Sequence, residues 1–245
     1  MSVIEILLIV GVVVFITHTL EAVTGFGCTV LSFPFVLFLM KDLEQTKIIL
    51  SILAWVLAGY FVATKFKRIY WKQFGIIILF AGLGMPVGMM IFKSLNADLL
   101  KRALGVFIVI SASIQLYNCF MPKSDTRKLP DFLGFFFLLA GGIVHGAFAV
   151  GGPLVVLYSA GKIPDKGQFR ATMCLLWATL NTVLMFQFRF ENKLNLETGR
   201  TLLILLPFLI AGIFAGEAIH NKVNEALFKK IVFASLLLVG IVMVI

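Results

Sequence analysis

The chain has 245 residues, of which 60% are hydrophobic and only 13% are charged, and its mean hydropathy is +1.04. Soluble domains carry about 45–50% apolar and about 25% charged residues, so this composition excludes an ordinary soluble domain and indicates a polytopic membrane protein. The formal net charge of +9 does not indicate nucleic-acid binding. The basic residues fall in short loops between apolar runs, where they set membrane orientation and meet anionic lipid headgroups.

The first apolar run, residues 3–22, predicts a transmembrane helix. It lacks the basic n-region and the small-residue cleavage site of a signal peptide, so we expect it to be retained. Most of the later runs are long enough for a full span of about 17–25 residues. The complete set of later runs covers residues 27–40, 47–63, 74–92, 99–121, 132–148, 152–161, 169–188, 201–219 and 228–245.

Two of these runs, 27–40 and 152–161, are too short to cross a membrane, and each follows a glycine-containing break. The first break lies within residues 18–34 and the second within residues 145–153. A helix in lipid rarely gives up backbone hydrogen bonds, because hydrocarbon offers no replacement. Matched breaks in the two halves of a chain indicate the binding site of a secondary transporter.

The two halves also align with each other as an internal repeat. At an offset of 124 residues, Glu21 aligns with His145 and Gly27 with Gly151. At an offset of 128, a later set aligns: Gly84, Gly88, Asn96, Leu99, Lys101 and Arg102 with Gly212, Gly216, Asn224, Leu227, Lys229 and Lys230. We therefore predict a first membrane repeat over residues 1–121, a cytoplasmic linker over 122–131 and a second membrane repeat over 132–245.

The predicted fold class is an all-α polytopic membrane protein of two inverted repeats, each with a glycine-broken helical hairpin and three transmembrane helices. Whether a hairpin re-enters the membrane or crosses it twice, each repeat has an odd number of crossings, which inverts the second. With the N-terminus outside, loops 64–73, 122–131, 161–170 and 220–230 are cytoplasmic and hold 13 of the 21 Lys and Arg residues. Counting each hairpin as one span divides these residues almost evenly. We expect a multi-pass protein of the cell membrane with extracytoplasmic termini.

Ionisable side chains beside the breaks are candidate proton carriers. Glu21, His145 and His18 lie in apolar sequence, where an acidic residue at a helix centre costs at least about 2.5–3.5 kcal/mol. Such residues usually face a bundle interior or a wet cavity and mark substrate or proton paths. For His18, an interfacial or hydrogen-bonding role is an equal alternative, whereas for Glu21 and His145 we favour a functional role.

The helices that begin after the breaks would present unpaired N–H groups and positive dipole ends to a ligand. Glycine lets a ligand approach the main chain, and Pro153 suits a first helical position. We predict that a small anion binds at the two breaks; the alternative is that the glycines only permit close helix packing. The predicted substrate-binding residues are Thr24, Gly25, Phe26, Gly27, Cys28, Thr29, Val150, Gly151, Gly152 and Pro153.

Other polar and aromatic residues have plainer interpretations. We expect Asn181 and Gln187 to form interhelical hydrogen bonds, with substrate contact as the alternative, and Arg170 to snorkel toward lipid headgroups, with substrate attraction second. The glycine pairs at 84/88 and 212/216 predict packing faces. The remaining expectations are a solvated pair, Glu217 and His220, and interface or packing residues, Trp55, Trp71 and Trp177.

The sequence contains no hydrolase, zinc-protease or P-loop motif. Its cysteines, Cys28, Cys119 and Cys174, have no CxxC spacing. His18 and Glu21 share a helix face, but two ligands make a weak metal site. We therefore expect neither an enzyme nor a bound cofactor or metal.

At the two breaks the chain resembles the sulfite exporter family TauE/SafE. The stretches that carry the resemblance are EAVTGFGCTVLSFP (21–34) and HGAFAVGGPLVV (145–156), the latter followed by QFRATMCLLWATLN (168–181), and the resemblance spans nearly the whole chain. Cys28 and Thr29 stand where the family often has glycine. The resemblance implies export of a small sulfur-containing anion, such as sulfite or an organosulfonate, coupled to an ion gradient.

The sequence thus predicts a secondary transporter that works by alternating access. Its predicted partners are a small anion, protons and membrane lipid. One rival is a passive anion channel built on the same glycines, which uphill accumulation driven by a pH gradient would exclude. The other is a membrane-embedded enzyme or assembly factor that uses His18, Glu21 and His145, which a stoichiometric bound metal would favour.

Overall fold

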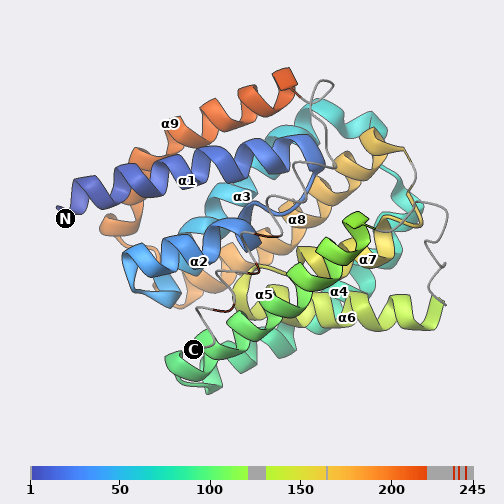
Figure 1. Cartoon of the computed structure of the whole chain (residues 1–245), viewed down its shortest axis with the longest axis horizontal. Helices are drawn as coiled ribbons and strands as arrows, with labels where there is room; N and C mark the ends of the chain where they lie inside the picture. The colour runs from blue at the N-terminus through green and yellow to red at the C-terminus, as the bar shows by residue number, and fades with distance from the viewer. Residues whose placement is uncertain are drawn as a thin grey trace. The chain divides into compact units, whose positions relative to one another are not determined.

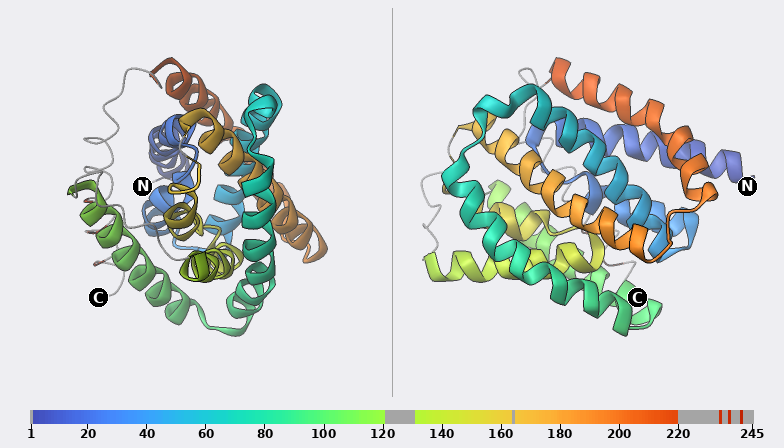
Figure 2. Two further views of the ribbon diagram at one scale, coloured as in Figure 1. Left: turned by 90° about the vertical axis from the view of Figure 1, so that its right-hand side faces the viewer. Right: turned by 180° about the vertical axis from the view of Figure 1, so that it is seen from behind.

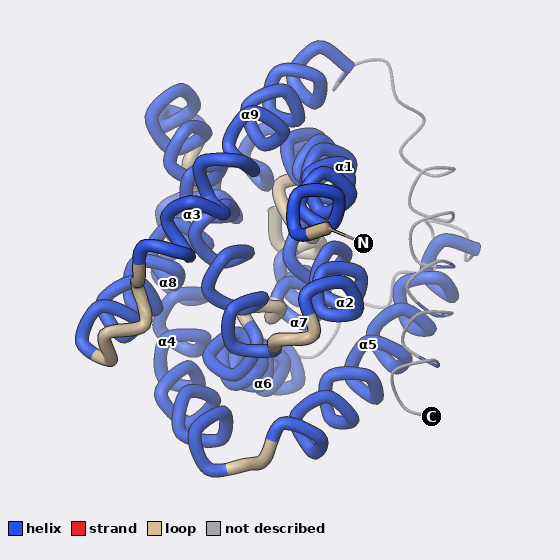
Figure 3. The backbone as a smooth tube through the Cα atoms, turned by 90° about the vertical axis from the view of Figure 1, so that its left-hand side faces the viewer, coloured by secondary structure: helices blue, strands red, loops and turns tan. Residues whose placement is uncertain are grey.

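The protein is described here from a computed structural model, in which the described part of the chain forms helices and loops and contains no strand (Figure 3). The structure describes residues 2–120, 131–163 and 165–219, together with Ala234, Leu237 and Ile241. The predicted linker 122–131 lies outside the described residues except for Asp131. The predicted loop 220–230, and the predicted span 228–245 apart from those three positions, lie outside them as well.

The helices follow the predicted apolar runs closely. They are α1 (Val3–Thr24), α2 (Cys28–Met40), α3 (Leu43–Lys65), the short 3-10 helix η1 (Phe66–Arg68), α4 (Trp71–Ser94), α5 (Ala97–Phe120), α6 (Asp131–Phe148), α7 (Gly152–Ser159), α8 (Lys166–Phe190) and α9 (Leu196–Ile219). Within the described residues, five helices are long and apolar enough to cross a membrane: α1, α3 with η1, α4, α8 and α9. The prediction of a helical, polytopic membrane protein is confirmed.

The two runs that follow the breaks are short helices, as predicted. Helix α2 has 13 residues and α7 has 8, so neither reaches the length of a full span.

The described helices fall into two compact units, and each unit draws on both halves of the sequence. The first unit contains α1, α2, α3, the start of α4, α8 and α9. The second contains the rest of α4 with α5, α6 and α7. The division of the chain into repeats over residues 1–121 and 132–245 stays a prediction.

In the first unit, α1 and α9 lie along one another (Figure 1). The glycine pair of α9 faces α1 at close range: a Cβ added to Gly212 would lie 2.9 Å from the Phe15 carbonyl oxygen, and one on Gly216 would lie 2.7 Å from that of Thr19. Because real Cβ atoms do not approach backbone this closely, only glycine fits here. The predicted packing role of this pair is confirmed.

The second unit contains the same contact between α4 and α6. A Cβ on Gly84 would overlap the carbonyl oxygen of Leu139, and one on Gly88 would overlap that of Ile143. Leu139 and Ile143 are the residues that the 124-residue offset aligns with the two α1 residues beneath the α9 glycines. The same type of helix contact therefore occurs in both units, each time between helices from opposite halves of the chain.

Helices α3 and α8 of the first unit pack side by side and run antiparallel (Figure 2, right). Near the start of α3, Lys47 Nζ lies 5.8 Å from the centre of the Phe188 ring, near the end of α8. Near the start of α8, the Arg170 guanidinium lies 4.7 Å from the centre of the Phe61 ring, near the end of α3. Each helix thus places a buried cation on an aromatic ring of the other.

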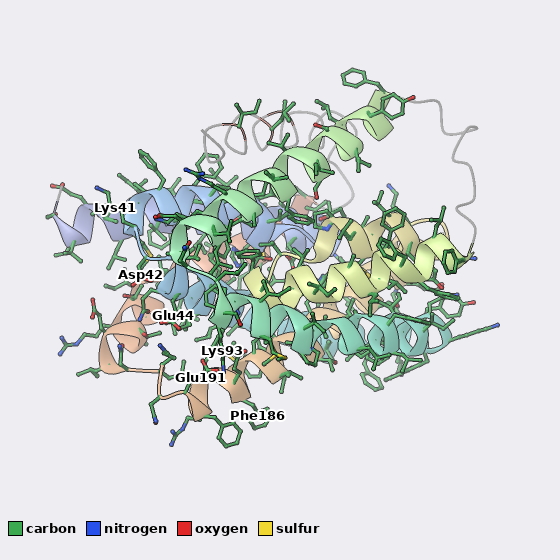
Figure 4. All side chains as sticks on the ribbon, turned by 90° about the horizontal axis from the view of Figure 1, so that it is seen from below. Lys41, Asp42, Glu44, Lys93, Phe186 and Glu191 are labelled. Carbon is green, nitrogen blue, oxygen red and sulfur yellow. The ribbon has the colours of Figure 1, made fainter. Side chains whose placement is uncertain are left out.

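The two helices also begin with the same cap. The Asp42 carboxylate accepts a hydrogen bond from the Gln45 N–H at 2.9 Å, and the Asp165 carboxylate accepts one from the Gln168 N–H at 2.7 Å. Figure 4 shows Asp42 and Glu44, at the start of α3, at the same end of the unit as Glu191, which follows α8. Helices with equivalent places in two inverted repeats must run in opposite directions, so this pairing supports the predicted inversion, which stays a prediction.

An ion pair ties the loop after α8 to the start of α3. Lys193 Nζ lies 2.9 Å from a carboxylate oxygen of Glu44. Hydrogen bonding to this carboxylate and its charge raise the pKa of Lys193 above its usual value, so the amine stays protonated at neutral pH.

The glycine contact between α4 and α6 makes a testable prediction. Gly84→Ala forces a methyl group into the backbone of α6 and should destabilise the protein by about 1–3 kcal/mol, the usual cost of overpacking. The measurement is the apparent melting temperature in detergent. Gly82→Ala is the matched control, because a Cβ at Gly82 meets nothing within 4 Å. Equal melting temperatures for the two variants would contradict the contact.

Candidate functional site

The first break is a turn in which glycine is required at two positions. Helix α1 ends at Thr24, and Gly25 follows with φ 87° while its N–H donates to the Glu21 carbonyl oxygen at 2.7 Å. Gly27 has φ 107° and stands immediately before α2. Residues with a Cβ rarely adopt such angles, so these two glycines explain why the helix breaks here.

The amino end of α2 is occupied by a side chain of the protein itself. The Glu21 carboxylate accepts a hydrogen bond from the Cys28 N–H, the first of α2, at 2.8 Å. The Glu21 side chain is buried, at 2% exposure, and its second oxygen, Oε1, has no hydrogen-bond partner among the described residues. The sequence predicts a bound anion at this helix end, and the structure places there the carboxylate that the sequence predicts to carry a proton.

Helix α8 holds the break in place from one side. Arg170 Nη1 donates to the Ala22 carbonyl oxygen at 2.8 Å, and Trp177 Nε1 donates to that of Gly25 at 3.0 Å. A Cβ on Gly25 would lie 2.7 Å from the Arg170 Cα, so the backbones of the turn and of α8 are in close contact. These side chains satisfy carbonyl groups at and just beyond the end of α1, which would otherwise be unpaired.

The expectation that Arg170 snorkels toward lipid headgroups is therefore wrong. Its side chain is 7% exposed and is held by the Ala22 carbonyl and the Phe61 ring. The need to pair the carbonyls at the end of α1 outweighs the tendency of an arginine near a helix end to reach water. Trp177 is buried, as the packing alternative for it predicts, whereas Trp55 and Trp71 are exposed.

Two cysteine thiols lie close enough to the Glu21 carboxylate to interact with its charge. Cys28 begins α2 and Cys174 lies on α8, one turn after Arg170; both are fully buried and neither forms a disulfide. His18, one turn before Glu21 on α1, is also fully buried. Its Nδ1 lies 2.9 Å from the Val14 carbonyl oxygen, and its Nε2 has no hydrogen-bond partner among the described residues.

The remaining predicted residues of the first break shape the turn. Thr24 Oγ1 lies 2.9 Å from both the Leu20 and the Phe26 carbonyl oxygens, so its hydroxyl is used within the turn. The Phe26 ring contacts the Phe169 ring edge-on, with centroids 6.2 Å apart. Thr29 is half-buried in the first turn of α2.

The second break repeats this backbone pattern with different residues. Ala149, which the 124-residue offset aligns with Gly25, has φ 59°, and its N–H donates to the His145 carbonyl oxygen at 2.7 Å. Gly151 precedes α7, and Pro153 lies in the first turn of α7 as predicted. The buried His145 side chain therefore stands at the place that Glu21 holds in the first break.

At the second break the left-handed position is taken by a residue other than glycine. Gly151 has φ −64°, which any residue adopts, and the left-handed position is taken by Ala149. Gly151 is needed for space, because a Cβ there would overlap the Gly141 carbonyl oxygen and lie 2.8 Å from the His145 Cβ. Close packing therefore requires glycine here, and the approach of a ligand to this backbone stays a prediction.

Comparison with protein families decides which proteins the chain is related to. The family model described as sulfite exporter TauE/SafE matches residues 9–243, a range that includes both breaks. The chain belongs to the TauE/SafE family. The predicted resemblance is thereby confirmed, and the family is one of membrane transporters. Searches of curated proteins and of solved structures found no match.

In this TauE/SafE chain, the predicted site residues form two sets. His18, Glu21 and residues 24–29 come together in the first unit, whereas His145 and residues 150–153 come together in the second. Val150, Gly151, Gly152 and Pro153 are all buried. The assignment of these residues to substrate and proton binding stays a prediction.

Several other polar residues differ from expectation. Asn181 is buried on α8, but its Oδ1 has no hydrogen-bond partner among the described residues, so the expected interhelical bond is missing for this atom. Gln187 Nε2 donates to the Glu191 carboxylate, also near the end of α8. Glu217 accepts from the Tyr60 hydroxyl at 2.7 Å and pairs with Lys65 at 3.3 Å, while His220 lies outside the described residues. No three His, Cys, Asp or Glu side chains of the described part cluster as metal ligands.

The Trp177 contact makes a testable prediction. Trp177→Phe keeps an aromatic ring but leaves the buried Gly25 carbonyl without its indole donor, which should cost about 1–3 kcal/mol of stability. Thermal unfolding in detergent measures the effect. Trp55→Phe is the control, since the Thr182 hydroxyl that the Trp55 indole N–H bonds also donates to the Ala178 carbonyl and keeps that hydrogen bond in the variant. A larger loss for Trp55→Phe than for Trp177→Phe would argue against this account of the break.

Proposed function

We propose that the protein is a secondary transporter that moves a small sulfur-containing anion, such as sulfite or an organosulfonate, across the cell membrane. Export is the direction that the family description suggests. The observation that carries the proposal is the amino end of α2, where a helix begins among buried residues and already binds a carboxylate. A helix end that binds one carboxylate offers the chemistry that another small anion needs.

The electrostatics of the first break favour a negative ligand. The Cys28 N–H and the dipole of α2 contribute partial positive charge on one side of the turn. The buried Arg170 guanidinium contributes a full positive charge on the other side, where it bonds the Ala22 carbonyl. Inside a membrane protein such charges are weakly screened, so they attract an anion more strongly than they would in water.

The paired breaks support a transport cycle coupled to protons. Glu21 and His145 hold equivalent places, each one turn before a left-handed residue that ends a helix, and both side chains are buried. Titratable groups in such places are proposed proton carriers, and alternating access between the two faces of the membrane is the proposed mode of transport. We propose that both termini lie on the extracytoplasmic side.

A screen of small anions tests the proposed substrate class. Purified protein in detergent is heated with sulfite, thiosulfate, methanesulfonate, sulfate or acetate, each against a chloride control of equal ionic strength. A ligand that binds only the folded state adds about 2.7 kcal/mol of stability at a concentration 100-fold above its Kd. A sulfur-containing anion should raise the apparent melting temperature most. If acetate alone stabilises the protein, the proposed class is wrong.

A substitution tests the proposed proton carrier. Glu21→Gln keeps an oxygen that can accept from the Cys28 N–H but cannot exchange a proton, so it should abolish proton-coupled anion transport while folding and membrane insertion stay intact. The measurement is anion flux into proteoliposomes under an imposed pH gradient. Glu44→Gln is the control, because that carboxylate pairs with Lys193 at the start of α3, the end opposite the contact between Phe61 and Arg170. Transport by Glu21→Gln at the wild-type rate would exclude this role.

A further inference from the structure

We propose that the Glu21 carboxylate is an internal substitute for the transported anion, and that the anion replaces it at the amino end of α2 only when Glu21 takes up a proton. One proton then binds with each anion, and the two move in the same direction. This inference rests on the proposed transport function and adds to it the rule by which proton and anion are coupled.

The Glu21 carboxylate lies directly at the start of α2. Cys28 is the first residue of α2, and its N–H is one of the groups that a helix leaves unpaired at its start. Glu21 lies seven residues earlier, and the left-handed turn at Gly25 and Gly27 brings its Oε2 to 2.8 Å from this nitrogen. The carboxylate therefore occupies the place that an incoming anion would take.

The second carboxylate oxygen of Glu21, Oε1, is in a different environment from Oε2. Glu21 Oε1 is buried and has no hydrogen-bond partner among the described residues. A carboxylate that served only as a structural cap would be expected to have both oxygens satisfied, since an unpaired buried acceptor costs about 1–3 kcal/mol. An oxygen left unpaired at a helix end is suited to bind a proton.

An ionised Glu21 carboxylate and an incoming anion would repel each other. Two unit charges 4 Å apart repel by about 4 kcal/mol at an effective dielectric constant of about 20. An anion that approached the end of α2 while Glu21 was ionised would meet this repulsion and would also compete for the same N–H. A proton on Glu21 removes the charge and weakens its hydrogen bond with the N–H, because charge-assisted hydrogen bonds are about twice as strong as neutral ones.

Several titratable groups surround Glu21, but they differ in their relation to the start of α2. On α1, His18 bonds the Val14 carbonyl through Nδ1 and has an unpaired Nε2 among the described residues. On α2 and α8, the facing groups are the Cys28 and Cys174 thiols, and Arg170 of α8 bonds the Ala22 carbonyl. On α3 and α9, Tyr60 and Glu217 interact with each other and with Arg170. Among these groups, Glu21 alone places a carboxylate on the α2 backbone.

The coupling follows from charge balance. A monovalent anion enters with one proton from the same side, Glu21 becomes neutral, and no net charge crosses the membrane. On the other side the anion leaves, Glu21 releases the proton to water, and its carboxylate returns to the Cys28 N–H. The steeper of the anion and proton gradients then sets the direction of net flow.

Calorimetry of anion binding tests this inference directly. Purified protein is titrated with methanesulfonate or thiosulfate, whose charges stay constant near neutral pH, in two buffers with different heats of ionisation. The wild type should take up about one proton per anion, and its affinity should fall about tenfold per pH unit once Glu21 is ionised in the free protein. Glu21→Gln should bind the anion with no proton uptake and with an affinity independent of pH, whereas Glu44→Gln should behave as the wild type.

The outcomes separate the inference from the proposed function. If the wild type binds none of the sulfur-containing anions, both are overturned. If it binds them without proton uptake, the internal-anion proposal is overturned and the transport function stands; proton uptake by Glu21→Gln leads to the same conclusion. Should that variant fail to fold, infrared difference spectroscopy of the wild type decides: anion binding should produce the band of a protonated carboxylic acid, and its absence would overturn the proposal.

Discussion

The constraint on which this structure depends is that a helix broken within a membrane protein must still pair its backbone groups. At the first break the chain meets this demand locally and from a neighbouring helix. The Gly25 N–H bonds back into α1, the Glu21 carboxylate pairs the first N–H of α2, and Arg170 and Trp177 of α8 pair two carbonyls at the end of α1. The same contacts underlie the proposed site, because a helix end that pairs one carboxylate has the N–H group that another small anion would need.

The predicted internal repeat would explain why the described units mix the two halves of the sequence. The α9 glycines pack on α1 in the first unit as the α4 glycines pack on α6 in the second. In each case a helix of one half covers the broken hairpin of the other half. The antiparallel pair α3 and α8, with matching aspartate caps, links the halves within the first unit. In these pairs, each helix therefore packs against a helix from the other half of the sequence.

The sequence predicted the helices and the breaks well, because hydrophobic run length and glycine placement report local preferences. It also predicted the burial of Glu21 and His145, since charged groups in apolar runs have few other solutions. It did not predict the contact between Glu21 and Cys28, which depends on the turn geometry at Gly25 and Gly27, nor the burial of Arg170, which depends on packing between distant segments. Lys47 and Arg170 each follow a capping aspartate by five residues, and this match was an available clue to a shared role.

In the proposed mechanism a proton gradient drives an anion through this protein, and Glu21 is the group that binds the proton when the anion binds. The most direct measurement is the accumulation of labelled sulfite or methanesulfonate inside proteoliposomes that start with equal anion concentrations on both sides, with an imposed pH gradient and the membrane potential clamped at zero. Methanesulfonate, whose own charge does not titrate, should accumulate on the alkaline side above its external concentration. Equal concentrations on the two sides, despite measurable flux, would exclude proton coupling and indicate a passive anion channel.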